Sequence, residues 1–479
     1  MHLIAVILAL VSPGDTPEWG GFRGSNGSGV AESASIPDAL DPEGNVLWRV
    51  EVPGGYSSPI VSGDRVFLTA TEGKRLLTLC LDRATGEIRW ERELEFDGKR
   101  PGGNSSASPT PATDGERVYA VFHSVGLIAY DFEGEELWRK TMGFNLPHGM
   151  ATSPVVHGDV VVLLVDQDTE AHLIALDKVT GEERWKALRP GVTHSYSTPA
   201  IYEPEEGPAQ VIVSGSLQIS GYSLVDGEKL WWVGGSAWQT KCVPVIAGDT
   251  CFVNAYMVPS AEFGIPKFTE TWEEVLAERD EDGDGKIARD EWDHGMLQMA
   301  WFIYDLDNDD LLDEKDYAFL QTSGTATGGL FAIRLGGRGN VSESHVRWKY
   351  DDRRGLPDVP TPIYYQDALV MIKEGGILSS FDPENGEVVK QGRVGDPDQY
   401  FASPVAADGK IILASVSGQL AVVSGGREWE VLSVNTLDED VWSTPAIAGD
   451  QVFVRSQDAL YCFQGDPPEA ESSDESSQD

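Results

Sequence analysis

Short apolar runs alternate with turn residues along most of the chain, and these runs come in groups of four. The clearest group spans residues 55–93, with apolar strands at 60–61, 66–71 and 76–81 and a fourth strand that carries Trp90. A Gly63-Asp64 pair separates the first two strands, and both residue types tolerate the positive φ of a two-residue hairpin turn. The pattern predicts a four-stranded antiparallel meander of about 45 residues, the size of one propeller blade.

Two markers show that this unit repeats. A Ser/Thr-Pro pair opens each unit, with its proline at Pro59, Pro111, Pro154, Pro199, Pro362, Pro404 and Pro445, and Val243-Pro244 replaces it once. A tryptophan closes most units, at Trp48, Trp90, Trp138, Trp185, Trp231 and Trp348. Neighbouring markers are 41–52 residues apart, except for one gap of 118 residues between the prolines and one of 117 between the tryptophans. Because both long gaps fall in the fifth unit, they predict an insertion there.

Eight units predict an all-β fold, an eight-bladed β-propeller of four-stranded antiparallel blades. Residues 45–52 match the fourth strand of a unit, whereas the last unit, from residue 442 to 464, supplies three strands. The N-terminal strand is therefore expected to complete the last blade and close the ring, which leaves no open sheet edge. The remaining units are expected at 104–142, 149–188, 195–233, 239–351, 357–394 and 399–434.

The Ser/Thr-Pro strands are expected to be innermost and to line a central channel. Three residues before each proline the chain carries Tyr56, Ser108, Ala151, Tyr196, Lys241, Val359, Phe401 and Trp442. Four of these eight are aromatic, and His148 and His194 lie just before two of the strands. The rings form either a ligand funnel at the channel mouth or packing between tapering blades; the sequence leaves both open.

The insertion, residues 258–325, has the periodicity of helices. Phe268, Trp272, Val275 and Leu276 fall on one helical face, with Thr269 as the expected N-cap. The next twelve residues, Asp280 to Glu291 (DEDGDGKIARDE), form the first candidate metal loop. Calcium prefers about seven oxygen ligands, which a twelve-residue loop between helices can supply.

The first loop has the required residue at each diagnostic position. The expected ligands are the side chains of Asp280, Asp282 and Asp284, the backbone carbonyl of Lys286, and a bidentate Glu291. Gly285 permits the sharp turn and Ile287 is expected to point inward. Ala288 occupies the ninth position and predicts a water ligand there.

A second loop, Asp305 to Asp316 (DLDNDDLLDEKD), starts 25 residues after the first. Its expected ligands are Asp305, Asp307, Asp309, the carbonyl of Leu311 and Asp316, with Asp313 at the ninth position. Asp310 replaces the usual glycine, and Asp316 is one methylene shorter than glutamate, which predicts weaker calcium binding and a shift toward magnesium.

A single helix of 13 residues is expected to connect the two loops. Its buried face is expected to contain Trp292, Met296, Met299, Ala300 and Ile303. The stretch of roughly 50 residues that holds both loops resembles the EF-hand family.

Composition restricts the partners. The chain has 36 basic and 78 acidic residues and a formal net charge of −42, so its surface repels nucleic acid and attracts cations. The four cysteines, Cys80, Cys242, Cys251 and Cys462, include no adjacent pair and no Cys-x-x-Cys motif, and we expect buried free thiols.

The two ends of the chain differ from the repeats. An apolar run from Leu3 to Val11 predicts a signal peptide over residues 1–18 that is too short to span a membrane. The absence of cysteine from the first 79 residues argues against a lipid anchor. Residues 19–44 form a glycine-rich lead-in, and residues 466–479 form an acidic tail expected to be disordered. We therefore divide the expected propeller into residues 45–257 and 326–465, around the insertion.

The motif LIALDKVTGEERW (173–185), together with the lead-in WGGFRGSNGSGV, resembles the quinoprotein-like (PQQ-like repeat) propeller family of secreted bacterial proteins. The resemblance implies that the tryptophan docks between blades and that Thr-Gly-Glu makes a turn. It also implies one of two functions: a dehydrogenase that uses pyrroloquinoline quinone (PQQ) beside calcium, or a non-catalytic scaffold for outer-membrane protein assembly. The dehydrogenases share an adjacent cysteine pair that this chain lacks, and Lys241 is the only cation among the eight channel positions.

The sequence therefore predicts a periplasmic or extracellular, non-enzymatic binding propeller. Calcium is its expected ligand, secreted or envelope proteins are its expected partners, and the inserted module shapes a partner surface. The alternative is a PQQ-dependent alcohol or sugar dehydrogenase with its site in the channel.

Overall fold

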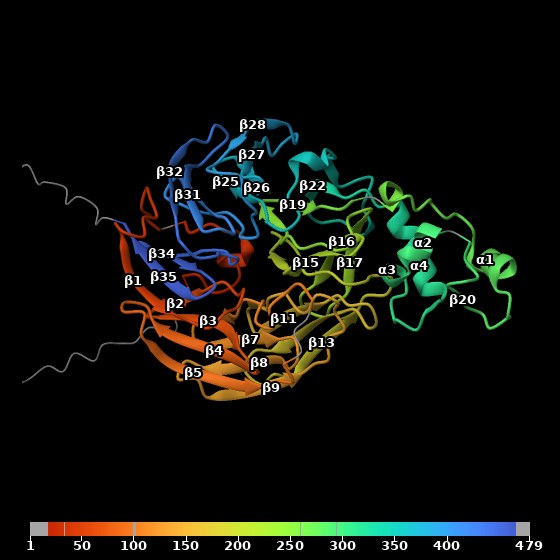
Figure 1. The fold of residues 1–479 in the computed structure, drawn as a ribbon, viewed down its shortest axis with the longest axis horizontal. Coiled ribbons are helices and arrows are strands. Elements are labelled where there is room, and N and C mark those ends of the chain that lie inside the picture. Colours follow the sequence, from red (N-terminus) through yellow and green to blue (C-terminus); the bar gives the residue numbers. More distant parts are fainter. Residues whose placement is uncertain (1–17, 33, 99–101, 259, 294, 466–479) are drawn as a thin grey trace, which may run out of the picture.

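The computed structural model describes residues 18–465, apart from 33, 99–101, 259 and 294. Eight antiparallel sheets surround a central axis, and a small helical module projects from one side of the ring (Figure 1). The predicted eight-bladed propeller is therefore confirmed. Except for Glu18, the expected signal peptide lies outside the described residues, as does the expected disordered tail.

Each blade runs from an innermost to an outermost strand. Blade one contains β2 (Ile60–Ser62), β3 (Arg65–Glu72), β4 (Arg75–Asp82) and β5 (Ile88–Glu95). Blade two contains β6 (Ala112–Thr113), β7 (Arg117–Phe122), β8 (Gly126–Asp131) and β9 (Glu136–Thr141). Blade three contains β10 (Val155–His157), β11 (Val160–Val165), β12 (His172–Asp177) and β13 (Glu183–Leu188). Blade four contains β14 (Ala200–Tyr202), β15 (Gln210–Gly215), β16 (Gln218–Ser223) and β17 (Lys229–Gly234), with the short β23 (Gly339–Asn340) added parallel to β17.

The second half of the ring continues the pattern. Blade five contains β18 (Val245–Ala247), β19 (Thr250–Ala255), β22 (Gly329–Arg334) and β24 (Val346–Tyr350). Blade six contains β25 (Ile363–Tyr365), β26 (Ala368–Lys373), β27 (Ile377–Phe381) and β28 (Val388–Arg393). Blade seven contains β29 (Val405–Ala407), β30 (Lys410–Ala414), β31 (Gln419–Ser424) and β32 (Val431–Thr436). Blade eight contains β33 (Ala446–Ala448), β34 (Gln451–Arg455) and β35 (Ala459–Gln464), and β1 (Val46–Glu51) is its outermost strand.

The N-terminal strand closes the ring as the sequence predicts. β1 pairs antiparallel with β35, in a register that places Trp48 opposite Cys462. Arg455 of blade eight adds a second link, because its buried guanidinium donates to the carbonyls of Ser57 (2.9 Å) and Thr69 (2.8 Å) in blade one. The first and last parts of the chain are thus held together by both a sheet ladder and a buried side chain.

The Ser/Thr-Pro pairs join neighbouring blades around the axis. In each bonded pair the backbone N–H of the residue before the proline donates to the hydroxyl of the corresponding Ser or Thr in the next blade. The pairs are Ser58–Thr110 (2.9 Å) and, each at 3.0 Å, Thr110–Ser153, Ser153–Thr198, Val243–Thr361, Thr361–Ser403 and Ser403–Thr444. Val243 has no hydroxyl, so it offers no acceptor to Thr198. The hydroxyl therefore recurs because it satisfies a buried N–H of the preceding blade.

Replacing Thr110 by valine is expected to lower the free energy of unfolding by about 1–3 kcal/mol, because the buried N–H of Ser58 loses its acceptor. Urea denaturation measures the change. Thr71→Val is the matched control, since the Thr71 hydroxyl is buried without a hydrogen-bond partner and should change stability little. Equal destabilisation of the two variants would contradict the proposed role of these hydroxyls as hydrogen-bond acceptors between neighbouring blades.

The closing tryptophans dock on the next blade. Their indole N–H groups donate to turn carbonyls: Trp48 to Arg83 (2.9 Å), Trp90 to Phe132 (2.8 Å), Trp138 to Lys178 (3.1 Å), Trp185 to Leu224 (2.9 Å) and Trp348 to Pro383 (2.9 Å). Each ring also covers the turn glycine; a Cβ on Gly181, for example, would lie 2.6 Å from the Trp138 ring, and its φ is +71°. Trp231 is the exception, because it bonds Gln210 of its own blade. The turn glycine is therefore required for both its backbone conformation and the tryptophan above it.

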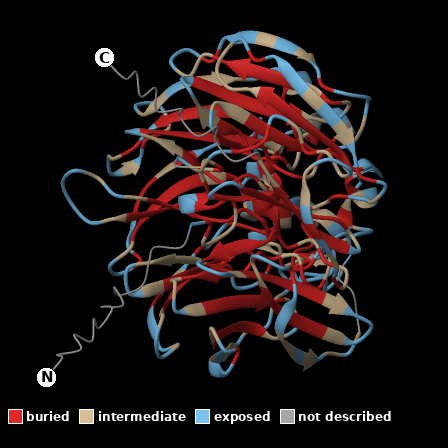
Figure 2. Ribbon diagram, turned by 90° about the vertical axis from the view of Figure 1, so that its left-hand side faces the viewer, coloured by how far each residue is buried: buried red, intermediate tan, exposed pale blue. Residues whose placement is uncertain are grey.

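The core lies between the blades. The middle strands of each blade are almost wholly buried, whereas the outermost strands alternate exposed and half-buried residues (Figure 2).

All four cysteines are buried and free, as predicted, and burial raises the pKa of the Cys80, Cys242 and Cys462 thiols to about 12. Among the described residues, no helix is long and apolar enough to cross a membrane.

The glycine-rich lead-in crosses one end of the channel and binds several blades. Trp19 pairs with Val61 of blade one, and the side chain of Asn26 bonds both backbone groups of Ile201 in blade four (2.6 and 2.7 Å). Arg23 is completely buried and donates to the carbonyls of Pro362 (2.9 Å) and Pro404 (3.3 Å), in blades six and seven. Burial lowers the pKa of Arg23 to about 9. The lead-in thus acts as a plug that ties the innermost strands together.

Candidate metal loops and channel cavity

The helices of the insertion lie between β19 and β22. They comprise η2 (Ser260–Phe263), α1 (Trp272–Arg279), α2 (Gly295–Met299), α3 (Trp301–Tyr304) and α4 (Glu314–Thr325), and a further turn, η3 (Arg353–Gly355), follows blade five. The expected cap at Thr269 is wrong, because α1 begins after Thr271, which forms a capping box with Glu274. Phe268 therefore precedes the helix on which it was expected.

The first loop folds around the carboxylate of Asp280. One oxygen accepts the backbone N–H groups of Gly283 (2.8 Å) and Asp284 (3.2 Å), and the other accepts that of Gly285 (3.0 Å). These bonds turn the loop so that ligand oxygens of Asp280, Asp282 and Asp284 lie within 4.8 Å of one another. Three carboxylates at that separation form a group that can hold a metal ion.

Glu291 ties the end of the first loop to its middle. Its two carboxylate oxygens accept the N–H groups of Glu281 (2.9 Å) and Ala288 (2.6 Å), the second and ninth residues of the loop. Gly285 has a φ of +83°, so the glycine predicted at the sharp turn is required there. Lys286 follows directly, with its ammonium in contact with the carboxylate of Asp309 in the second loop.

The second loop repeats the geometry of the first despite its two substitutions. Asp305 accepts the N–H groups of Asp309 (3.1 Å) and Asp310 (2.9 Å), and Asp305, Asp307 and Asp309 form the second group of three carboxylates within 4.8 Å. Asp310 adopts the left-handed conformation of the glycine that it replaces, with φ +68°.

The shorter side chain of Asp316 still reaches the positions that Glu291 reaches in the first loop. It accepts the N–H groups of Leu306 (3.1 Å) and Asp313 (3.0 Å), again the second and ninth residues. Burial raises the pKa of Asp316 to about 7 and also raises that of Asp305. Their charged forms are therefore disfavoured by loss of solvent, which a bound cation would offset.

A two-residue ladder joins the loops back to back. β20 (Ile287–Ala288) pairs antiparallel with β21 (Leu311–Leu312), and Ile287 lies opposite Leu312. Both side chains are completely buried, as expected for Ile287. The two loops therefore form one unit.

The connection between the loops differs from the single helix that was expected. α2 and α3 are separated at Ala300, whose φ of −95° and ψ of 9° leave the helical region. The expected buried face is correct for Trp292, which is buried, and for Ala300 and Ile303, which are half-buried and pack against the core. It is wrong for Met296 and Met299, which are exposed, and it missed the buried Leu297, Trp301 and Tyr304. Apolar residues occur around the whole segment, so its periodicity could not identify the inner face.

The module packs against the propeller through a shared core. One apolar cluster includes Trp231 of blade four, Val253 of blade five, and Trp292 and Leu320 of the insertion. Beside it, α4 reaches the loop between β11 and β12 in blade three, where Lys315 donates to the carbonyls of Asp168 and Thr169. The second metal loop, to which Lys315 belongs, is therefore attached to the ring.

A chain of contacts continues from α4 to the channel mouth. The rings of Phe319 and Trp238 lie 5.9 Å apart, and Trp238 meets His194 edge to face at 5.4 Å. The two ring nitrogens of His194 contact the carboxylate of Asp168 and the amide of Gln239, each at 2.6 Å. Both nitrogens are thus engaged, and Gln239 lines the channel.

The eight predicted channel positions all line one cavity of about 450 Å³. On one wall Trp442 stacks between Tyr56 (ring centroids 4.9 Å apart) and Phe401 (4.7 Å). Phe22 of the lead-in lines this cavity and also a second one of about 640 Å³, whose lining includes further lead-in residues from Gly20 to Gly27. The predicted aromatic positions therefore face a cavity and also pack on one another.

The charge of the mouth cavity is balanced. Among the described residues that line it, Lys241 is the only Lys or Arg, and its ammonium lies 2.6 Å from the carboxylate of Asp358. Across the described part of the chain, the groups of three or more potential metal ligands are the two Asp triads of the insertion. Within the described part of the cavity lining, the single Lys or Arg is thus already paired, and neither Asp triad lies in that lining.

A buried ion pair that the sequence did not reveal supports the loops at the mouth. Arg189 and Asp166 are both almost inaccessible to solvent, and their closest atoms are 2.6 Å apart. Asp166 also accepts the hydroxyl of Ser195 at 2.8 Å. Burial lowers the pKa of Arg189, but Asp166 and Tyr222 outweigh it and hold the pKa above its usual value. Both residues lie in irregular segments next to strands, where no periodic signal marks them.

Comparison with known proteins identifies the repeats. The family model described as outer membrane protein assembly factor BamB matches residues 38–145, 80–256 and 338–466, on both sides of the insertion. No curated protein sequence is significantly similar to the chain.

Solved structures share the fold at low sequence identity. BamB from Moraxella catarrhalis has a TM-score of 0.54 and 10% identity, covering 88% of this chain and 99% of that one. A europium-containing methanol dehydrogenase has a TM-score of 0.56 and 12% identity, covering 93% and 98%. The quinohemoprotein alcohol dehydrogenase ADHIIG from Pseudomonas putida HK5 has a TM-score of 0.56 and 12% identity, covering 95% and 82%. Proteins with different functions are similar to this chain to about the same extent, so the shared fold alone does not assign any of those functions to it.

Proposed function

Because this chain belongs to the PQQ-like repeat propeller family whose model is described as outer membrane protein assembly factor BamB, we propose that it is a non-enzymatic binding propeller of the bacterial periplasm or cell exterior. We further propose that its insertion is an EF-hand pair that binds calcium. The partners would be secreted or envelope proteins, and the module would contribute a surface to that interaction.

The observation that carries the calcium proposal is the matching geometry of the two loops. In each loop the first carboxylate binds backbone N–H groups of the sharp turn, and the twelfth carboxylate binds those of the second and ninth residues. In each loop, oxygens of the first, third and fifth side chains lie within 4.8 Å of one another, and such a group of oxygens is what calcium coordination requires. The twelfth carboxylate closes the loop through its backbone hydrogen bonds, and we propose that it turns to the ion when calcium binds. The proposed ligands are those expected from the sequence, with the carbonyls of Lys286 and Leu311 at the seventh positions.

Calcium would also contribute to folding of the insertion. Residues 258–325 contain 19 Asp or Glu and five Lys or Arg, an excess of 14 negative charges. Repulsion among them opposes the closed loops, so cation binding is coupled to their ordering. Because α4 packs on blade three and on Trp238, that ordering extends to loops at the channel mouth.

The second loop is expected to bind more weakly, and one change tests the reason. Asp310→Gly should tighten calcium binding at this loop by about two- to fivefold, because glycine adopts a φ of +68° without the steric cost of a Cβ. Asp310→Ala is the matched control, since it removes the same charge but keeps the Cβ, and it should not tighten binding. Isothermal titration calorimetry with calcium measures both affinities; equal affinities of the two variants would show that backbone strain does not limit this loop.

The dehydrogenase alternative finds less support in the cavity. Among the described residues of the cavity, an anionic quinone would meet the Lys241–Asp358 pair, whose charges already cancel. Reduction of an electron-accepting dye by protein supplied with pyrroloquinoline quinone and calcium would restore this alternative.

Calorimetric titration of chelator-treated protein tests the proposed function. We expect two saturable calcium-binding events, the tighter at the first loop, and weaker competition by magnesium there than at the second loop. Weak binding without saturation, as an acidic surface alone produces, would contradict it.

A further inference from the structure

The segment that connects the two metal loops, Gly295–Tyr304, is apolar on all sides although half of it faces solvent. Its sequence is GMLQMAWFIY, in which Gln298 is the single amide or charged side chain, and the hydroxyl of the buried Tyr304 contacts Ser260 inside the module. That amide is used inside the module, donating to the carbonyls of Arg289 (3.1 Å) and Trp292 (2.7 Å). A surface helix normally presents polar residues to water, and one that is hydrophobic all round is normally covered.

The exposed side of this segment is a defined face. Ala300 links α2 to α3, because its N–H donates to the carbonyl of Met296 (3.1 Å) and its carbonyl accepts the N–H of Ile303 (2.9 Å). Leu297, Trp301 and Tyr304 recur at helical spacing and are at most 3% exposed. Met296, Met299 and Phe302 are three residues apart in sequence and are 41%, 70% and 74% exposed. We call these three residues the apolar face.

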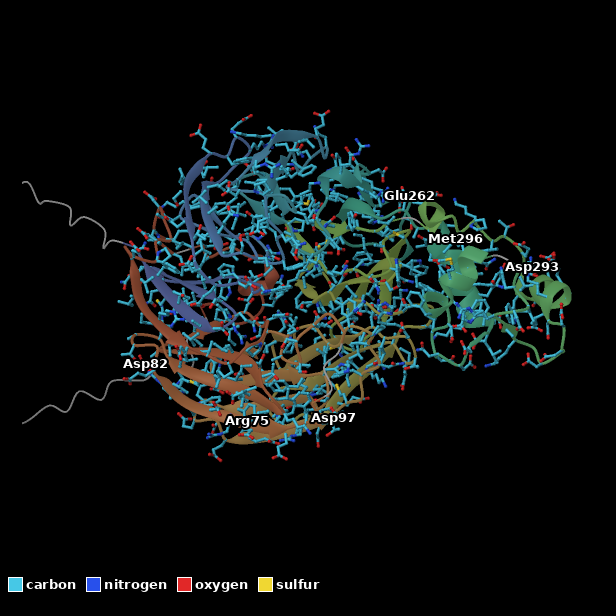
Figure 3. The ribbon with its side chains drawn as sticks, viewed as in Figure 1. Arg75, Asp82, Asp97, Glu262, Asp293 and Met296 are labelled. Carbon is cyan, nitrogen blue, oxygen red and sulfur yellow. The ribbon has the colours of Figure 1, made fainter. Side chains whose placement is uncertain are left out.

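The position of the apolar face makes it accessible. Met296 belongs to the module that projects from the ring, as do Glu262 and Asp293 (Figure 3). Methionine side chains are flexible and adapt to different apolar partners, and a large exposed aromatic ring is a frequent anchor in protein interfaces. The face therefore has the chemistry of a docking site.

Charge selects the class of partner. The insertion carries an excess of 14 negative charges, of which two calcium ions would neutralise four. A second copy of this chain, with its net charge of −42, an anionic membrane and nucleic acid are all repelled. A protein segment that places Lys or Arg on either side of an apolar stripe satisfies both the apolar face and the acidic loops at its two ends.

We propose that the apolar face of Met296, Met299 and Phe302 docks a cationic amphipathic segment of a partner protein. This inference rests on the proposed binding function and names the chemistry of the partner. Calcium-bound loops hold the two ends of the connecting segment, so the face is presented in a fixed orientation only when both loops are folded.

Synthetic peptides test the proposal on the full-length protein with calcium present. The probe is an 18-residue helical peptide with a leucine stripe and lysines on its other faces. One comparison peptide replaces lysine by glutamate, and another replaces leucine by serine. Fluorescence anisotropy should show that the Leu/Lys peptide binds about tenfold or more tightly than either comparison peptide.

Two variants locate the binding. Met299→Ser combined with Phe302→Ser should weaken binding of the Leu/Lys peptide by about tenfold. Leu188→Ser combined with Val225→Ser is the matched control, because these residues are 62% and 74% exposed on the propeller, and it should bind the peptide as the unchanged protein does. Urea denaturation and circular dichroism establish that both variants remain folded.

Each contrary result has a defined meaning. Unchanged binding by the Met299/Phe302 variant, or equal binding of all three peptides, would overturn the proposal. Binding to vesicles of neutral phosphatidylcholine in place of the peptide would assign the face to a membrane instead. Native mass spectrometry of the same samples counts bound calcium. If the Leu/Lys peptide binds protein that carries no calcium, the metal proposal fails and the docking proposal stands.

Discussion

Replacing Arg189 by methionine is expected to lower the free energy of unfolding by about 3–5 kcal/mol, one of the largest effects of any single substitution in this chain. The guanidinium is completely buried and contacts both oxygens of Asp166, at 2.6 and 3.1 Å. Methionine fills much of the same space but leaves a buried carboxylate without its counter-charge. Urea denaturation followed by tryptophan fluorescence measures the loss.

A second substitution separates charge from packing at this position. Adding Asp166→Asn to the Arg189→Met protein removes the unpaired charge and should recover a substantial part of the lost stability. If the double variant loses as much free energy of unfolding as the Arg189→Met and Asp166→Asn variants lose together, the two side chains are not coupled. That result would contradict the explanation by an unpaired charge. The loop between β11 and β12 also holds Asp168, so the unstable variant should expose the channel mouth first.

Glu291→Gln is expected to weaken calcium binding at the first loop by about 30- to 100-fold. The change keeps the size of the side chain but removes a charged oxygen ligand, which corresponds to about 2–3 kcal/mol. The second loop should retain its affinity to within a few-fold, because its twelfth ligand is Asp316. Calorimetric titration with calcium resolves the two sites.

Asp290→Asn is the control for this effect. It removes one negative charge, as Glu291→Gln does, but at a position outside the proposed ligand set. The long-range electrostatic attraction for calcium therefore falls equally in the two variants, whereas the set of coordinating oxygens is unchanged in Asp290→Asn. Its affinity should therefore fall by no more than about twofold to threefold. Similar losses in the two variants would mean that calcium is attracted by the acidic surface and is not coordinated by Glu291.

The repeats made most of the fold predictable. Ser/Thr-Pro, the turn glycine and the closing tryptophan each perform a local task that recurs in most blades, so their spacing predicts the number of blades and the closure by β1. The two Asp triads of the insertion could also be predicted, because the loop pattern places acidic residues at fixed positions, and the structure brings them together. In both cases the sequence signal is local and repeated.

Other features depend on contacts that are unique and distant in sequence. Arg23 and Asn26 form the channel plug by reaching strands more than 170 residues away, and nothing in the lead-in except its glycines marks this role. Lys315 attaches the second loop to Asp168 of blade three in the same way. The inner face of the connecting segment could not be predicted because apolar residues surround it.

Native mass spectrometry of the full-length protein, prepared in calcium-containing medium, tests the central claim most directly. We expect a mass increase of one or two calcium ions, with no organic ligand. Protein that carries no calcium would contradict the metal assignment, and an additional quinone-sized mass would transfer the function to the channel cavity.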